Sequence, residues 1–141
     1  MTLHDPARRL LVERGAAEHV VKGGLEGLVT AWEQTALAAQ RGYAQGLEDW
    51  RDDVDARQLI DLAWKVALPA QRKSLKPRLE AADARFWKAC EAGACTWGAT
   101  VAARESWSAA THWWYFLAPK KAGRALAQDL AALASATGGS R

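Results

Sequence analysis

Apolar side chains recur every three or four residues along most of this chain, which is the spacing of α-helices with one buried face. The longest stripe predicts a long helix that ends near Gly42, and its members are Leu25, Leu28, Val29, Trp32, Ala36, Ala39 and Tyr43. Shorter stripes predict helices through residues 59–67, 75–90 and 126–133. We expect the long helix to pack against the two helices that follow it.

Glycines, prolines and short polar side chains indicate where these helices begin and end. Asp5-Pro6 is typical of a helix start, and the short helix after it should stop near Gly15. The pair at 68–69, Leu followed by Pro, should close the helix through 59–67. Ser74 then predicts a helix cap, which would place Pro77 in the first turn, where its missing N–H does no harm.

The last third of the chain is less regular. Residues 93–107 show no clear period and predict a loop that contains one short helix. The run 112–117 is apolar on every side, which fits a buried helix or a buried strand, and Pro119 should end it. Together the patterns predict an all-α, single-domain bundle of five to six helices over 1–141, with a Trp-rich segment near the C-terminal end. That segment should cover one end of the bundle, and a tail of about 136–141 should fray.

Composition and charge change this prediction little. The chain has 141 residues and a formal net charge of +3, so it is large enough for a core and only mildly basic. It holds no run of about 18 apolar residues, and no basic stretch precedes an apolar one at the N-terminus. We therefore expect no membrane span and a cytoplasmic location. Cys90 and Cys95 should be thiols in that compartment.

Candidate catalytic and metal-binding chemistry is sparse. The acids in 49–55 lack the central Gly and closing Glu of a calcium loop, so we interpret them as N-terminal caps of a helix that starts near Asp55. The three histidines lack the spacings with which one helix offers two metal ligands. Glu105, Ser106 and His112 are residue types of nucleophilic catalysis, but no oxyanion or phosphate loop accompanies them. We predict no metal, no cofactor and no catalytic residue.

Eight tryptophans are the most unusual feature of the chain. Trp32 and Trp64 fall on apolar stripes and should be core residues. Trp87 lies beside its stripe and should flank the core, whereas Trp50 lies among acids and should be half exposed. Eight indoles exceed what a small helical core usually needs, so some should lie at the surface, where Trp, Tyr and Arg dominate interface energetics.

The leading hypothesis is therefore a non-enzymatic helical domain that binds another protein, or a second copy of itself, through an aromatic surface. The predicted contact residues are aromatic, with a cationic rim: Trp107, Trp113, Trp114 and Tyr115, with Lys120, Lys121 and Arg124. Two other classes stay open. Single-stranded nucleic acid could stack on the same indoles, since residues 69–92 hold six basic and three acidic side chains. A small-molecule site or enzyme could be lined by these aromatics, with His112 and Glu105 as polar groups.

Overall fold

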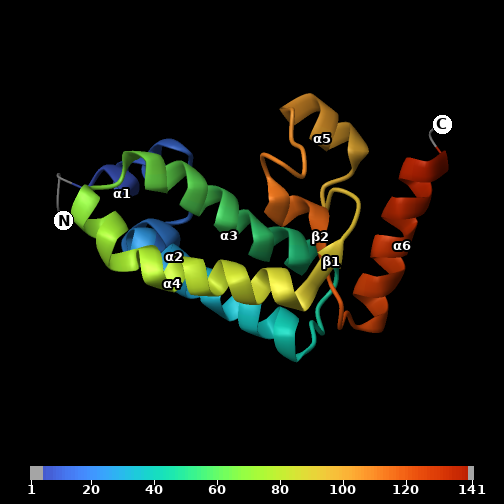
Figure 1. Ribbon diagram of the computed structural model, residues 1–141. Helices are drawn as coiled ribbons and strands as arrows, with labels where there is room; N and C mark the ends of the chain where they lie inside the picture. Colours follow the sequence, from blue (N-terminus) through green and yellow to red (C-terminus); the bar gives the residue numbers. More distant parts are fainter. Residues whose placement is uncertain (1–4, 140–141) are drawn as a thin grey trace.

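The computed structural model describes residues 5–139, with side chains as far as Ser135. This part of the chain forms six α-helices, a 3₁₀ helix and two short strands, which confirms the predicted all-α fold (Figure 1). In chain order they are α1 (Pro6–Glu13), α2 (Glu18–Arg41), α3 (Leu47–Val66), α4 (Pro69–Ala89), β1 (Cys90–Ala92), α5 (Ala99–Glu105), the 3₁₀ helix η1 (Trp113–Phe116), β2 (Leu117–Pro119) and α6 (Arg124–Gly139).

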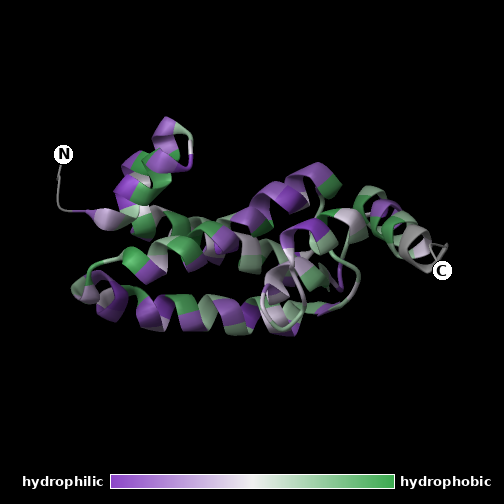
Figure 2. Cartoon of the chain, turned by 90° about the horizontal axis from the view of Figure 1, so that it is seen from above, coloured by the Kyte–Doolittle hydropathy of each residue, from purple (hydrophilic) through white to green (hydrophobic). Residues whose placement is uncertain are grey.

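Helices α2, α3 and α4 form the body of the bundle, and α2 packs against both of the others, as the stripes predicted. Val29, Trp32 and Ala36 of α2 are completely buried, and Ile60 of α3 and Phe86 of α4 meet them in one core. Apolar and polar segments alternate along each of these helices in Figure 2, as expected where one face of a helix is buried. The short helix α1 closes the bundle against α2 and α3.

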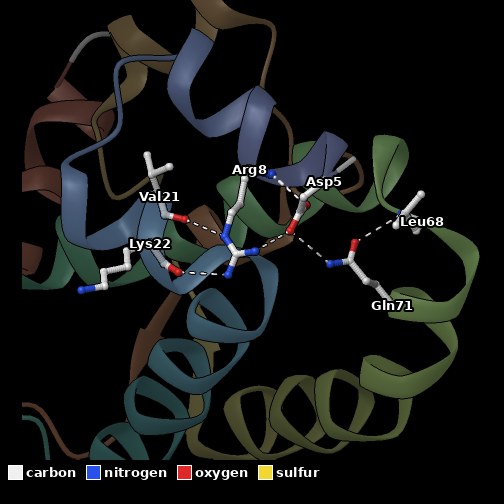
Figure 3. Close-up of polar contacts among 6 residues, drawn as sticks. All are labelled: Asp5, Arg8, Val21, Lys22, Leu68 and Gln71. Carbon is white, nitrogen blue, oxygen red and sulfur yellow. Dashed lines mark hydrogen bonds and ion pairs between the residues drawn. The ribbon is translucent and has the colours of Figure 1, made fainter. Parts of the chain in front are cut away.

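The junction of α1 and α2 depends on Gly24 and on Arg8, whose polar contacts Figure 3 draws. Gly24 interrupts α2 with φ 63° and ψ −158°, a conformation that only glycine adopts readily. The break deprives carbonyls in the preceding turn of their helical partners, and the Arg8 guanidinium donates to the carbonyl oxygens of Val21 (3.1 Å) and Lys22 (3.0 Å). Asp5 caps α1 by accepting from the Arg8 backbone N–H (3.1 Å) and also pairs with the Arg8 guanidinium (2.8 Å). The predicted helix start at Asp5-Pro6 is thus confirmed.

Replacing Gly24 with alanine is expected to destabilise the fold by about 1–3 kcal/mol because a left-handed backbone angle would be imposed on a residue with a Cβ. The added Cβ would also lie 3.1 Å from Arg8 Nε, which its hydrogen bonds hold in place. Gly27→Ala is the matched control, since Gly27 is helical and an added Cβ there meets no atom within 4 Å. Urea unfolding of both variants tests this, and equal midpoints would contradict it.

Helix α3 begins at Leu47, well before the predicted start near Asp55. Most of the acids are therefore not N-terminal caps, and that interpretation was wrong for Asp53 and Asp55. Both lie inside the helix and accept hydrogen bonds from phenols, Asp53 from Tyr43 and Asp55 from Tyr115, each at 2.6 Å. Burial raises the pKa of both carboxyls, and the phenol hydrogen bonds oppose that rise. The two acids thus act as partly buried acceptors through which Tyr43 and Tyr115 are held against α3.

Helix α4 begins at Pro69 and not at Ser74, so the predicted cap at Ser74 was wrong and Pro77 lies inside the helix. Pro69 supplies the favourable first-turn proline that we had assigned to Pro77. Pro77 cannot donate to the carbonyl of Lys73, but both residues are exposed, so water can take that hydrogen bond. The helix therefore continues through a proline that the sequence pattern places at a boundary.

The aromatic run 112–117 is neither a regular α-helix nor a long strand. Residues 113–116 form η1, and β2 follows directly, paired antiparallel with β1 so that Cys90 faces Pro119 and Ala92 faces Leu117. This pairing attaches the run to the end of α4, and η1 packs on α3. The short helix expected within 93–107 is α5, which ends where Ser106 adopts a left-handed conformation with φ 59°.

Helix α6 follows the β1–β2 pair and lies at the end of the bundle opposite α1 (Figure 1). Its Leu126 is completely buried, and the helix contacts α3. It continues to Gly139, and Ser140, Arg141 and His4 lie outside the described residues. The predicted fraying of 136–141 stays a prediction. In the part of the chain that the structure describes, no helix has the length and apolar character needed to cross a bilayer.

Candidate functional site

The eight indoles divide into core and surface residues. Three are buried and five are partly or largely exposed. The buried ones are Trp32, Trp50 and Trp114; the partly exposed ones are Trp64, Trp97, Trp107 and Trp113; and Trp87 is 49% exposed. The expectation that Trp50 is half exposed was wrong, because α3 starts early and turns Trp50 inward, where it stacks on Phe86 at 5.6 Å.

The four aromatic residues predicted to contact a partner do not form one surface. Trp114 and Tyr115 are only 2% and 1% exposed, so they belong to the core. Trp107 and Trp113 reach solvent in part but pack differently: Trp107 stacks on Tyr115 at 4.4 Å, whereas Trp113 packs on Trp87 at 5.2 Å. The sequence predicted only that Trp87 flanks the core. In the structure Trp87 contacts Trp113 and is 49% exposed.

A nearly buried ion pair positions Trp113. Arg57 is 9% exposed, and its guanidinium donates to both carboxylate oxygens of Asp83, at 2.9 and 3.0 Å. The indole N–H of Trp32 also donates to Asp83, at 2.8 Å. The Arg57 guanidinium lies over the rings of Trp113 and Trp114, at 5.3 and 5.1 Å from their centroids. Trp113 therefore rests on a fixed charged platform, and Trp87 packs beside it.

Beside this aromatic pair, a groove of about 430 Å³ runs between α3 and α4. Arg57 and Asp83 line its inner part, and Trp64 and Leu79 add apolar walls. Its α4 edge carries Lys73, Lys76 and Glu80. We call the groove together with Trp87 and Trp113 the Trp87 surface.

The cations of the Trp87 surface differ in how they are used. Arg57 pairs with Asp83, and Arg72 caps α3 by donating to the carbonyl of Ala67 at 2.6 Å. Lys73 and Lys76 are exposed, and within the described residues neither has an ion-pair partner. Two lysines thus remain available to an acidic ligand. The excess of bases in 69–92 was the sequence signal for them, but it could not place them beside Trp87.

The predicted cationic rim lies elsewhere. Lys120, Lys121 and Arg124 are exposed in and after the turn that follows β2. The carbonyl of Lys121 accepts from the N–H of Tyr43 at 2.8 Å, which places this turn at the end of α2 (Figure 1). No contact among the described residues joins these three cations to Trp107 or Trp113.

A second aromatic pocket lies on the other side of α3. At 100° per residue, Asp55, Gln58 and Leu59 face away from the side that carries Arg57, Asp61 and Trp64. Asp55, Gln58 and Leu59 line a cavity of about 550 Å³, and Trp97, Trp107 and Tyr115 complete its aromatic wall.

His112 and Glu105 are not assembled as a catalytic pair. The His112 ring packs on Trp107 at 5.6 Å, and its Nδ1 lies 2.9 Å from the hydroxyl of Thr111. Burial lowers the pKa of His112, and the charge of Asp61 opposes that shift. Glu105 pairs with Arg104 at 3.2 Å, and no hydrogen bond or ion pair in the described part of the chain joins it to His112. The geometry thus gives no support to nucleophilic catalysis by these residues.

The two thiols and the acids also show no assembled reactive centre. Cys90 and Cys95 are free and buried, and burial raises the pKa of Cys90 to about 12, so this thiol stays protonated at neutral pH. Among the residues that the structure describes, no three His, Cys, Asp or Glu side chains gather as metal ligands. Comparison of the chain with models of protein families, with curated proteins and with solved structures gave no match.

Proposed function

We propose that this chain is a non-enzymatic helical domain that binds an acidic, amphipathic segment of a partner protein at the Trp87 surface. The observation that carries the proposal is that Trp87 is 49% exposed and packs on Trp113. The Arg57–Asp83 ion pair in turn holds Trp113 in place. Free cysteines are typical of a reducing compartment, so we propose that binding takes place in the cytoplasm.

The residue types at this surface are those that dominate binding energy. Trp and Arg are enriched among residues whose truncation weakens a complex, and Trp113 over Arg57 combines both. Because the bidentate bond to Asp83 and the packing under two indoles restrict Arg57, little conformational entropy is lost when a partner covers Trp113. Trp87 and Trp113 thus offer a preorganised apolar anchor.

The shape and charge of the groove indicate the kind of partner. A groove between two helices suits an amphipathic helix, which would lay its apolar side on Trp64, Leu79 and the Trp87–Trp113 pair. Lys73 and Lys76 border the groove and lack partners in the described residues, so carboxylates on that helix would complement them. Charge complementarity of this kind mainly raises association rate and specificity.

Selection of peptides from a phage-displayed library of helical 16-residue sequences tests the proposal. We expect the wild-type chain to enrich acidic peptides with apolar positions three and four residues apart. Trp87→Ala should weaken the selected peptides at least about tenfold, which corresponds to about 1.4 kcal/mol. Lys73→Glu with Lys76→Glu should weaken them most at low salt, because salt screens exposed charges.

Val12→Ala is the matched control, since Val12 is an exposed apolar residue, 61% accessible, on α1. It should leave peptide affinity unchanged. Three outcomes overturn the proposal: no enrichment of acidic amphipathic peptides, equal affinity of Trp87→Ala, or a wild-type dimer that Trp87→Ala dissociates in sedimentation velocity. The last result would show that a second copy of the chain occupies the surface.

A further inference from the structure

The cavity on the opposite side of α3 has features of a ligand site that are independent of the Trp87 surface. It has a volume of about 550 Å³ and lies between α3, α5 and the end of α1. Its lining combines the rings of Trp97, Trp107 and Tyr115, the carboxylate of Asp55, and the guanidinium groups of Arg14 and Arg104. We call this the Asp55 pocket.

The α3 wall of the pocket presents acceptors that lack donors. One carboxylate oxygen of Asp55, Oδ1, accepts from the Tyr115 hydroxyl at 2.6 Å and from the Trp97 indole N–H at 3.2 Å. The other oxygen, Oδ2, has no hydrogen bond within the described residues. Gln58 lies three residues along the same helix face, and its buried Oε1 also has no partner in this part of the chain. Gln58 Oε1 is covered by neighbouring protein atoms, so Asp55 Oδ2 is the acceptor that a ligand with an N–H donor can reach from the pocket.

The aromatic walls are held in place by the rest of the fold. Trp107 stacks on Tyr115 with ring planes 23° apart, and Tyr115 is itself fixed by Asp55. Trp97 is restrained by its indole bond to Asp55 and by the Arg51 guanidinium, which lies 5.0 Å from the ring centroid. Rigid indoles bind flat rings well, at about 1–3 kcal/mol for each stacked nucleobase.

The rim of the pocket favours an anion. Arg14 and Arg104 are exposed and line the opening. Arg104 is partly neutralised by Glu105, but Arg14 has no ion pair in the described residues. A simple amine or guanidinium would satisfy Asp55 but would be repelled by these two cations. A ligand with an uncharged amino donor at one end and an anionic group at the other would satisfy both.

We infer that the Asp55 pocket binds a nucleotide whose base carries an exocyclic amino group. The amino group donates to Asp55 Oδ2, the ring lies against Trp107, and the phosphate contacts Arg14. Asp accepts hydrogen bonds from the cytosine amine, so this residue type suits such a base. Free mononucleotide and single-stranded nucleic acid share this chemistry.

Calorimetric titration of the full chain with CMP and with UMP tests the inference. UMP carries an acceptor oxygen where CMP carries the amine, so the Asp55 carboxylate should favour CMP by at least tenfold. Asp55→Asn is the decisive variant. The carbonyl oxygen of the new amide side chain can still accept from Tyr115 and Trp97, and the amide NH2 then points toward the ligand. Because an NH2 group donates, the pocket should now prefer the acceptor oxygen of UMP.

Three further measurements separate the contacts and the source of the ligand. Asp52→Asn, at an exposed acid on the same helix, is the matched control and should retain the CMP preference. Arg14→Ala should weaken CMP several-fold but leave cytidine, which has no phosphate, unchanged. Octameric oligo(rC) that binds at least a hundredfold more tightly than CMP would identify nucleic acid as the source, and equal affinity would identify the free nucleotide.

Equal binding of CMP and UMP, or absence of binding by both at millimolar concentration, overturns the inference. So does a CMP preference that survives Asp55→Asn. Trp87→Ala should not change CMP affinity, so failure of the nucleotide pocket and failure of the protein-binding surface can be told apart.

Discussion

Arg57→Ala is expected to lower the free energy of unfolding by about 3 kcal/mol, the lower end of the cost typical of removing one partner from a buried ion pair, because the Asp83 side chain is 22% exposed. The variant leaves the Asp83 carboxylate without its bidentate donor while the Trp32 N–H alone still donates to it. It also removes the cation that lies over two indole rings, and it opens a cavity beneath Trp113.

Urea unfolding followed by circular dichroism measures the effect, and Arg78→Ala provides the comparison. Arg78 forms more ion pairs than Arg57, with Glu26 at 3.2 Å and Glu33 at 2.7 Å, but its side chain is 36% exposed. Exposed pairs contribute about 0.2–1 kcal/mol, so Arg78→Ala should be mild. Equal destabilisation by the two substitutions would refute the assignment of Arg57 and Asp83 as a desolvated pair.

A double variant separates the charge from the packing. Arg57→Leu with Asp83→Leu removes both charges at once, so no uncompensated carboxylate remains. Replacing a buried ion pair by apolar residues is often neutral or stabilising. We expect the double variant to be clearly more stable than Arg57→Ala, although the Trp32 N–H then loses its acceptor.

Trp50→Ala is the second large effect that we expect, at about 3–5 kcal/mol of lost stability. The indole is completely buried, stacks on Phe86 with ring planes 12° apart, and meets Tyr43 edge-on at 4.8 Å. Removal of this side chain leaves a cavity at the centre of the aromatic core. Trp50→Phe should cost less, because a ring remains against Phe86 and the indole N–H, which has no partner among the described residues, disappears.

Trp87→Ala is the matched control within the same residue type. Surface substitutions usually change stability by no more than about 0.5 kcal/mol, and Trp87 is about half exposed. It should therefore change peptide binding while it changes the unfolding midpoint little. If Trp87→Ala destabilised the fold as much as Trp50→Ala, Trp87 would be a structural residue and the binding proposal would lose its main support.

The periodic stripes were a good guide wherever a helix buries apolar residues alone. They placed the core of α2, the stop at Gly42 and the packing of α2 against α3 and α4. They failed at the start of α3, because only Trp50 and Val54 are buried before Asp55 and the first turns of the helix are rich in acids. They failed at Pro77 because a proline on the solvent side of a helix costs less than the pattern assumes.

The candidate sites were predictable only in part, and the reason is geometric. Residues 113–116 are all aromatic, so the chain itself does not distinguish Trp113, which reaches solvent, from Trp114, which is buried. That distinction arises because a 3₁₀ helix turns adjacent side chains in different directions. The partner of Trp113, Trp87, is distant in sequence and comes beside it only through the pairing of β1 with β2.

By itself, the amino-acid sequence determined the helical class, most helix positions and the surplus of indoles, because each follows from local spacing and composition. Tertiary structure decided which indoles are buried, that Asp53 and Asp55 accept from tyrosines, and that Arg57 and Asp83 pair beneath Trp113. Those outcomes depend on contacts between residues that are distant in sequence. Such contacts form only where packing brings side chains close enough to exclude water. The spacing of apolar residues along one helix does not specify which side chains of another element will meet it.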